Sequence, residues 1–148
     1  MGELPQQRPG DVTILDMEAS IEHLTRGTVR NVDALLVVTE PYYRSLETTG
    51  RIVPLARELG LERVWVVANK VRDAREEAAI REYCARHGFE IMGVLPFDAS
   101  VTEADQQGRA LIDYMPTAAA VLAVERLVET LLDRLAMPAL AGGAPWPA

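Results

Sequence analysis

The stretch that decides the fold runs from Val12 to Ser20 and reads VTILDMEAS. Its first four residues are apolar or β-branched, and Asp16 follows them directly. Such a run predicts a buried strand that ends by presenting a carboxylate at the edge of a sheet. A carboxylate placed there can hold magnesium, directly or through water, beside a nucleotide phosphate. An aspartate that only closes a turn after the strand is the alternative interpretation.

Three further apolar runs predict strands at residues 32–39, 64–68 and 89–95. Helices are expected from Ser45 to Leu59, from Asp73 to the residues before Gly88, within 102–112, and after a cap at Thr117. The last of these helices shows an apolar face made of Val121, Val124, Val128, Leu131 and Leu135. The alternation of strands and helices predicts an α/β fold, a mostly parallel sheet flanked by helices.

The length and composition indicate one domain with short flanking segments. A chain of 148 residues can bury a core of its own. Residues 1–10 contain two prolines and two glycines and predict a flexible lead-in, residues 11–136 predict the domain, and residues 137–148 predict an unfolded tail.

The net charge and the cysteine content indicate which partners are excluded and in which compartment the protein is found. The net charge is −7, so a nucleic acid would be repelled over most of the surface. No run of 18 apolar residues and no apolar leader are found, so the sequence predicts no membrane association and a cytoplasmic location. The single cysteine, Cys84, fits a reducing compartment.

Polar residues follow each predicted strand and should meet at the carboxyl edge of the sheet, where ligands bind in such folds. They are Asp16, Glu40, Asn69 with Lys70, and Asp98. The pair Asn69-Lys70 is similar to the guanine-reading motif Asn-Lys-x-Asp, but Arg72 stands in place of its aspartate. The amide of Asn69 could instead bond an adenine edge, or it could only close a turn.

The sequence contains no phosphate-binding loop. Such a loop needs glycines and a lysine within about eight residues. Of the 15 basic residues 14 are arginine, and Lys70, the one lysine, has no glycine-rich surroundings. Cys84 and His87 share one face of a predicted helix, where a buried thiol is a simpler interpretation than a metal ligand.

Several segments together resemble one family of ATPases. The segments 16–24 (DMEASIEHL) and 26–28 (RGT) resemble the Walker B and switch II region of the accessory ATPases that mature nickel-containing carbon monoxide dehydrogenase. Those proteins belong with MinD, ParA and the nitrogenase iron protein among deviant P-loop ATPases. Later landmarks of the same family resemble residues 40–41, 45–48, 69–71 and 94–98.

The resemblance implies a fold, a cofactor and roles for individual residues. The fold would be an incomplete P-loop NTPase layer sandwich of the nitrogenase iron protein type. Asp16 would organise magnesium through water, and Ser20 would occupy a switch II position where the family has glycine. The adenine of ATP would be framed by Asn69, Val94, Leu95, Pro96 and Asp98. The implied partners are ATP and carbon monoxide dehydrogenase, with nickel insertion as the task.

The resemblance covers the carboxy-terminal half of the family's domain only. In the family, the P-loop strand lies between the strands that match Val12 to Leu15 and Ala34 to Val38. Either these two strands pair directly here, or an open slot invites a missing P-loop half or a homodimer partner. The sequence thus predicts part of an ATP-binding maturation factor that does not hydrolyse ATP alone. The alternatives are one half of a split ATPase and a non-catalytic α/β interaction module.

Overall fold

The computed structural model describes residues 12–18, 24, 27 and 31–136 of the chain. Their helices and strands are, in order, β1 (Leu35–Thr39), α2 (Tyr43–Glu58), β2 (Val64–Val71), α3 (Ala74–His87), β3 (Ile91–Pro96), α4 (Ala99–Gln106), α5 (Leu111–Tyr114) and α6 (Ala119–Ala136). The three strands form a parallel sheet in the order β1-β2-β3. This confirms the predicted α/β fold.

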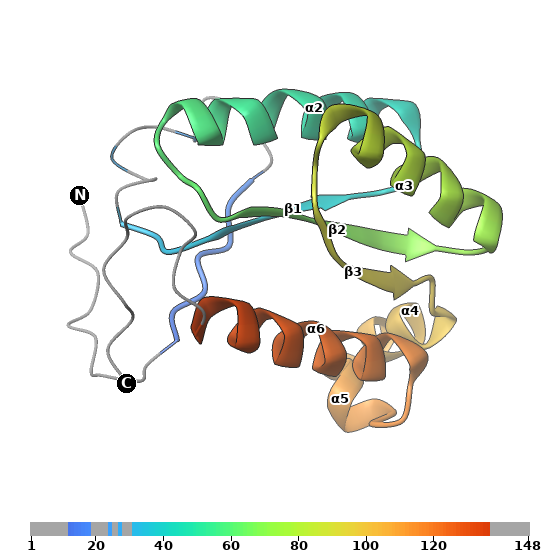
Figure 1. Cartoon of the computed structure of the whole chain (residues 1–148). Coiled ribbons are helices and arrows are strands. Elements are labelled where there is room, and N and C mark those ends of the chain that lie inside the picture. Colours follow the sequence, from blue (N-terminus) through green and yellow to red (C-terminus); the bar gives the residue numbers. More distant parts are fainter. Residues whose placement is uncertain (1–11, 19–23, 25–26, 28–30, 137–148) are drawn as a thin grey trace.

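The helices cover the two faces of the sheet unequally (Figure 1). Helices α2 and α3 lie on one face, and α6 lies on the other. The α2/α3 face holds the larger core, in which Val53, Val66 and Ile80 have at most 1% of their surface exposed. On the α6 face, Trp65, Val67 and Met92 form a smaller core that Leu127 and Leu131 cover. The strands are therefore buried on both faces at β2, as their continuous apolar sequences predict.

Helix α3 begins and ends where its sequence predicts. The Asp73 carboxylate accepts a hydrogen bond from the Glu76 backbone N–H at 2.8 Å, which supplies the cap. The Glu76 carboxylate in turn accepts from the Arg72 N–H at 2.7 Å. Gly88 ends the helix with φ of 67°, a left-handed conformation that costs glycine little.

Helix α2 begins earlier than predicted. The sequence predicts Ser45 as its N-cap, but the N-cap is Tyr42, three residues before it, and no side chain caps the helix. The Ser45 hydroxyl instead accepts from the Glu40 N–H at 2.9 Å and lies 3.1 Å from the Thr39 hydroxyl. It joins the end of β1 to the first turn of α2.

The segment Val12 to Glu18 is the main departure from the prediction. It forms no strand, and Val12, Ile14 and Leu15 are 66%, 88% and 43% exposed. A strand needs a neighbour to pair its backbone groups, and among the described strands β1 pairs with β2 alone. Direct pairing of this segment with β1 is thus not observed, and the edge of β1 facing away from β2 carries no described strand.

Helix α6 carries the predicted apolar face, but the residues of that face are buried to different degrees. Val121 is buried, and Leu131 and Leu135 pack on the sheet, as expected. Val124 and Val128 belong to the same apolar face but are 44% and 46% exposed, and they line a cavity that is described below.

Candidate functional site

A cavity of about 890 Å³ lies at the carboxyl ends of β2 and β3. The ends of the two strands form one wall, and helices α4, α5 and α6 form the others. Its lining is mostly apolar, with Val101, Ile112, Val124 and Val128 among the contributing side chains. A cavity of this size and character, with a few polar groups at one end, is typical of a small-molecule site.

Asn69 and Lys70 reach this cavity from an irregular end of β2. The register between β2 and β3 shifts between Ala68 and Val71, so Asn69 and Lys70 fall on a bulge. Lys70 has φ of 55°, which is uncommon for a residue with a side chain. The Asn69 side chain has no hydrogen-bond partner among the described residues, so both its amide donors and its carbonyl oxygen are available to a ligand.

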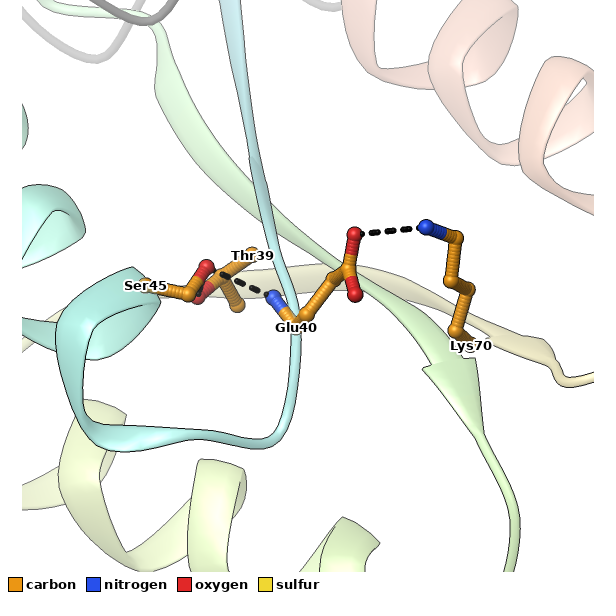
Figure 2. A network of polar contacts seen from close by, with 4 residues as sticks. All are labelled: Thr39, Glu40, Ser45 and Lys70. Atoms are coloured by element: carbon orange, nitrogen blue, oxygen red, sulfur yellow. Dashed lines mark hydrogen bonds and ion pairs between the residues drawn. The ribbon is translucent and has the colours of Figure 1, made fainter.

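A polar network ties the ends of β1 and β2 together (Figure 2). Lys70 Nζ donates to Glu40 Oε1 at 2.9 Å, across 30 residues of sequence. The hydrogen bond to Glu40 and its negative charge raise the pKa of Lys70. The Glu40 backbone N–H donates to Ser45, which places the first turn of α2 at the same point. The network therefore fixes the carboxyl edge of the sheet beside Asn69.

Asp98 lines the cavity and caps two helices at once. Its Oδ1 accepts from the Ser100 backbone N–H at 3.0 Å and from the Ser100 hydroxyl at 2.6 Å, at the start of α4. Its Oδ2 accepts from the Ala120 N–H of α6 at 3.1 Å. The Ser100 hydroxyl, followed by the Ala120 N–H, lowers the pKa of this carboxyl group.

The remaining adenine-side candidates divide between the two faces of the sheet. Leu95 and Pro96 line the cavity with Asn69 and Asp98. Val94 packs against the core on the α2/α3 side and is not among the lining residues. The structure therefore brings together four of the five residues that were expected to frame adenine.

The candidates for the phosphate side are not brought to this cavity. Asp16 is exposed and lies in the segment without a strand, and it is not a lining residue. Ser20 lies outside the described residues. Within the described part of the chain no three or more His, Cys, Asp or Glu side chains gather as a metal site. The cavity thus has the size and the lining of a small-molecule site, and Asp16 lies outside it.

The sequence predicts Asn69 and the end of β3 as site residues, but it does not predict the contacts that join these segments to their neighbours. The ion pair between Glu40 and Lys70 and the bond from Ala120 to Asp98 join residues 30 and 22 positions apart. The one available signal was that Glu40 and Lys70 each follow a predicted strand, which places them at the same sheet edge. No signal in the sequence linked Asp98 to α6.

Comparison with known proteins places the chain beside ATP-binding proteins. It is 39% identical to the carbon monoxide dehydrogenase accessory protein CooC of Rhodospirillum rubrum, over 72% of this chain and 40% of that protein. It is 39% identical to an uncharacterized ATP-binding protein of Methanocaldococcus jannaschii, over 68% of this chain and 39% of that protein. The chain thus spans about two fifths of the length of these relatives. No protein-family model matches it.

Solved structures give the same fold. The MinD protein in the MinC:MinD cell division complex of Aquifex aeolicus superposes with a TM-score of 0.64 at 19% identity, over 83% of this chain and 52% of that one. A ParA family ATPase from Chlorobium tepidum gives a TM-score of 0.61 at 21% identity, over 76% of this chain and 47% of that one.

The chain therefore has the fold of part of the MinD and ParA proteins. Within that class the chain belongs with the CooC-like ATP-binding proteins. None of the helices in the part of the chain that the structure describes is long and apolar enough to cross a membrane.

Proposed function

We propose that these 148 residues supply the adenine side of an ATP site in a CooC-like maturation factor for carbon monoxide dehydrogenase. The observation that carries the proposal is the cavity at the ends of β2 and β3, where Asn69 meets Leu95, Pro96 and Asp98. An apolar wall suits the face of a purine, and an unpartnered asparagine amide offers the donor and acceptor that an adenine edge needs. Nickel insertion is the task that the family resemblance implies for the whole protein.

The proposal includes that the chain alone does not hydrolyse ATP. The sequence has one lysine and no glycine-rich loop, and Lys70 Nζ is already bonded to Glu40. The phosphates and the magnesium ion would be held by a segment outside these 148 residues. This part of the proposal would be contradicted if the purified chain released phosphate from magnesium ATP faster than buffer alone.

Adenine recognition is tested by titration of the isotopically labelled chain with adenosine and with ATP. Contacts to the base alone are expected to give a Kd of about 1 mM, equal to about 4 kcal/mol. Amide shifts should centre on Asn69 and on Leu95 to Asp98. Asn69→Ala should weaken binding by up to about tenfold, because one hydrogen bond contributes about 0.5–1.5 kcal/mol.

The matched control is Asn31→Ala. Asn31 is the other asparagine of the chain, is exposed, and donates to the Gly27 carbonyl at 2.8 Å, away from the cavity lining. It should leave adenosine binding unchanged. Equal effects of the two substitutions, or shifts that miss the β3 end, would contradict an adenine site here.

A second candidate function is a non-catalytic α/β interaction module. It is favoured by the edge of β1 that no described strand covers and by the exposed Val38 beside it. This candidate predicts saturable protein binding that ATP does not alter. Strong dependence of that binding on ATP would instead favour one half of a split ATPase, completed by a chain that bears the P-loop.

A further inference from the structure

Phe97 forms part of the cavity wall and is fixed there by its backbone. It follows the end of β3 and is one of the lining residues. Its N–H donates to the Val71 carbonyl at 2.8 Å, which ties its main chain to the end of β2. The side chain is 46% exposed, although phenylalanine is among the residues most often buried. The wall therefore holds an aromatic ring at a fixed point with part of its surface uncovered.

One side of this ring is covered by Arg72. The Arg72 Cζ lies 4.7 Å from the ring centroid of Phe97, within the range of a cation–π contact. Arg72 is not a lining residue of the cavity, so its guanidinium covers the ring from the side that is turned away from the cavity. The other side of the ring is the part that a ligand in the cavity can contact.

Arg72 is itself positioned at the start of α3. Its backbone N–H donates to Glu76 Oε2 at 2.7 Å, and its Nη1 lies 3.7 Å from Glu76 Oε1. The Arg72 side chain is 60% exposed, so Glu76 and Phe97 are the contacts that orient it. A cation held over an aromatic ring restricts the rotation of that ring, which lowers the entropy that a ligand must remove when it binds.

An aromatic ring with an open face in a cavity wall is a surface on which a nucleobase stacks. We infer that Phe97 is the stacking face for the purine ring and that Arg72 is a positioning residue that holds Phe97 in place. The inference rests on the proposed function and adds two residues to its site. The Asn69 amide, in the same lining, then contacts the edge of the stacked ring.

This role also accounts for the residue at position 72. In the guanine-reading motif Asn-Lys-x-Asp the fourth residue is an aspartate, whereas Arg72 stands there in this chain. A carboxylate accepts hydrogen bonds from the N–H groups of guanine, but a guanidinium has donors only. Arg72 supports the ring of Phe97 instead of contacting a base edge. Stacking accepts any base, so the preference for adenine depends on Asn69, and guanosine should bind about threefold more weakly than adenosine.

The stacking face is tested by titration of the labelled chain and its variants with adenosine, which carries no phosphate. Phe97→Ala and Phe97→Leu should each weaken binding about tenfold, because leucine keeps an apolar contact but has no π face. Phe97→Tyr should bind within about twofold of the wild type, since it keeps the ring. The adenine protons should shift upfield when they bind the wild type, as protons above an aromatic ring do, and should not shift upfield with Phe97→Leu.

The positioning role is tested by two replacements of Arg72. Arg72→Ala should weaken adenosine binding about threefold, whereas Arg72→Lys, which keeps a cation over the ring, should retain most of the affinity. The matched control is Arg109→Ala, because Arg109 lies over the Tyr114 ring at 5.5 Å and neither residue lines the cavity. This control should bind adenosine as the wild type does. Urea unfolding checks that each variant is folded.

Four outcomes would overturn the inference. Phe97→Leu with the wild-type affinity would exclude stacking. Arg72→Ala with weaker binding of ATP but unchanged binding of adenosine would make Arg72 a phosphate contact, and equal losses in Arg72→Ala and Arg109→Ala would exclude a specific role of Arg72. Adenosine binding that needs Asn69 but not Phe97 would overturn this inference and leave the proposed function standing, whereas a wild type that binds no adenosine would overturn both.

Discussion

The replacement Asp98→Ala tests the connection between the cavity and the fold. One carboxylate caps α4 through Ser100 and reaches the first turn of α6 through Ala120. Loss of a helix cap costs about 1 kcal/mol, and loss of a negative charge at a helix N-terminus costs about 0.3–1 kcal/mol. With two helices affected, the free energy of unfolding should fall by about 2–3 kcal/mol. In urea this lowers the midpoint by about 1 M, with the slope unchanged.

Two further variants test whether Asp98 caps two helices. Asp98→Asn keeps one acceptor oxygen and should lose about half as much stability. Asp73→Ala removes the single cap of α3 and should cost about 1 kcal/mol. A loss in Asp98→Ala below about 0.5 kcal/mol, or no larger than that in Asp73→Ala, would refute the double cap.

The pH dependence of stability is an independent test of the contacts of Asp98. The pKa of Asp98 is lowered in the folded protein, so its contribution is complete above the unfolded pKa of about 3.9 and is lost as pH falls through the folded pKa. The stability difference between the wild type and Asp98→Asn should be constant from about pH 7 to pH 5 and should narrow below about pH 4. A difference that grows on acidification would contradict the assignment.

Two further substitutions probe the strained bulge and the core. Lys70→Gly should be more stable than Lys70→Ala by about 1 kcal/mol in urea unfolding. Both variants lose the exposed ion pair, but only glycine adopts φ of 55° without cost. Equal stability of the two variants would argue against backbone strain at this position. Ile80→Ala should lose about 2–5 kcal/mol, since this side chain is 0% exposed in the larger core; a loss under about 1 kcal/mol in thermal unfolding would contradict its central position.

The sequence predicted the helices and strands whose ends are set by residues a few positions apart. Asp73, Glu76 and Gly88 set both ends of α3 because a cap and a left-handed glycine act within a few residues. Strand β2 was found because its five-residue apolar run needs cover on both faces. Near β3 the predicted helix within 102–112 divides into α4 and α5, since Asp98 starts a helix at Ala99 and Ala110 precedes a second one.

Features that depend on distant neighbours were not predictable in the same way. Val124 and Val128 have the spacing of a buried helical face, but they line a cavity and stay 44% and 46% exposed. Val12 to Leu15 has the composition of a strand, but a strand is defined by its partner. In both cases the sequence pattern indicates an element's preference, whereas its burial or strand pairing depends on distant neighbours.

The polar residues at the carboxyl edge of the sheet differ in what positions them. The ends of β1, β2 and β3 are joined to neighbouring elements within the described residues, by the caps of Asp98 and by the pair of Glu40 with Lys70. Asp16 is exposed and lies outside the lining of the cavity. If the chain is one half of a split ATPase, its association with the chain that bears the P-loop and the binding of ATP share one equilibrium, and ATP must strengthen that association by the same factor by which the association strengthens ATP binding. For an interaction module that factor is one, so measuring it in either direction decides between the two functions.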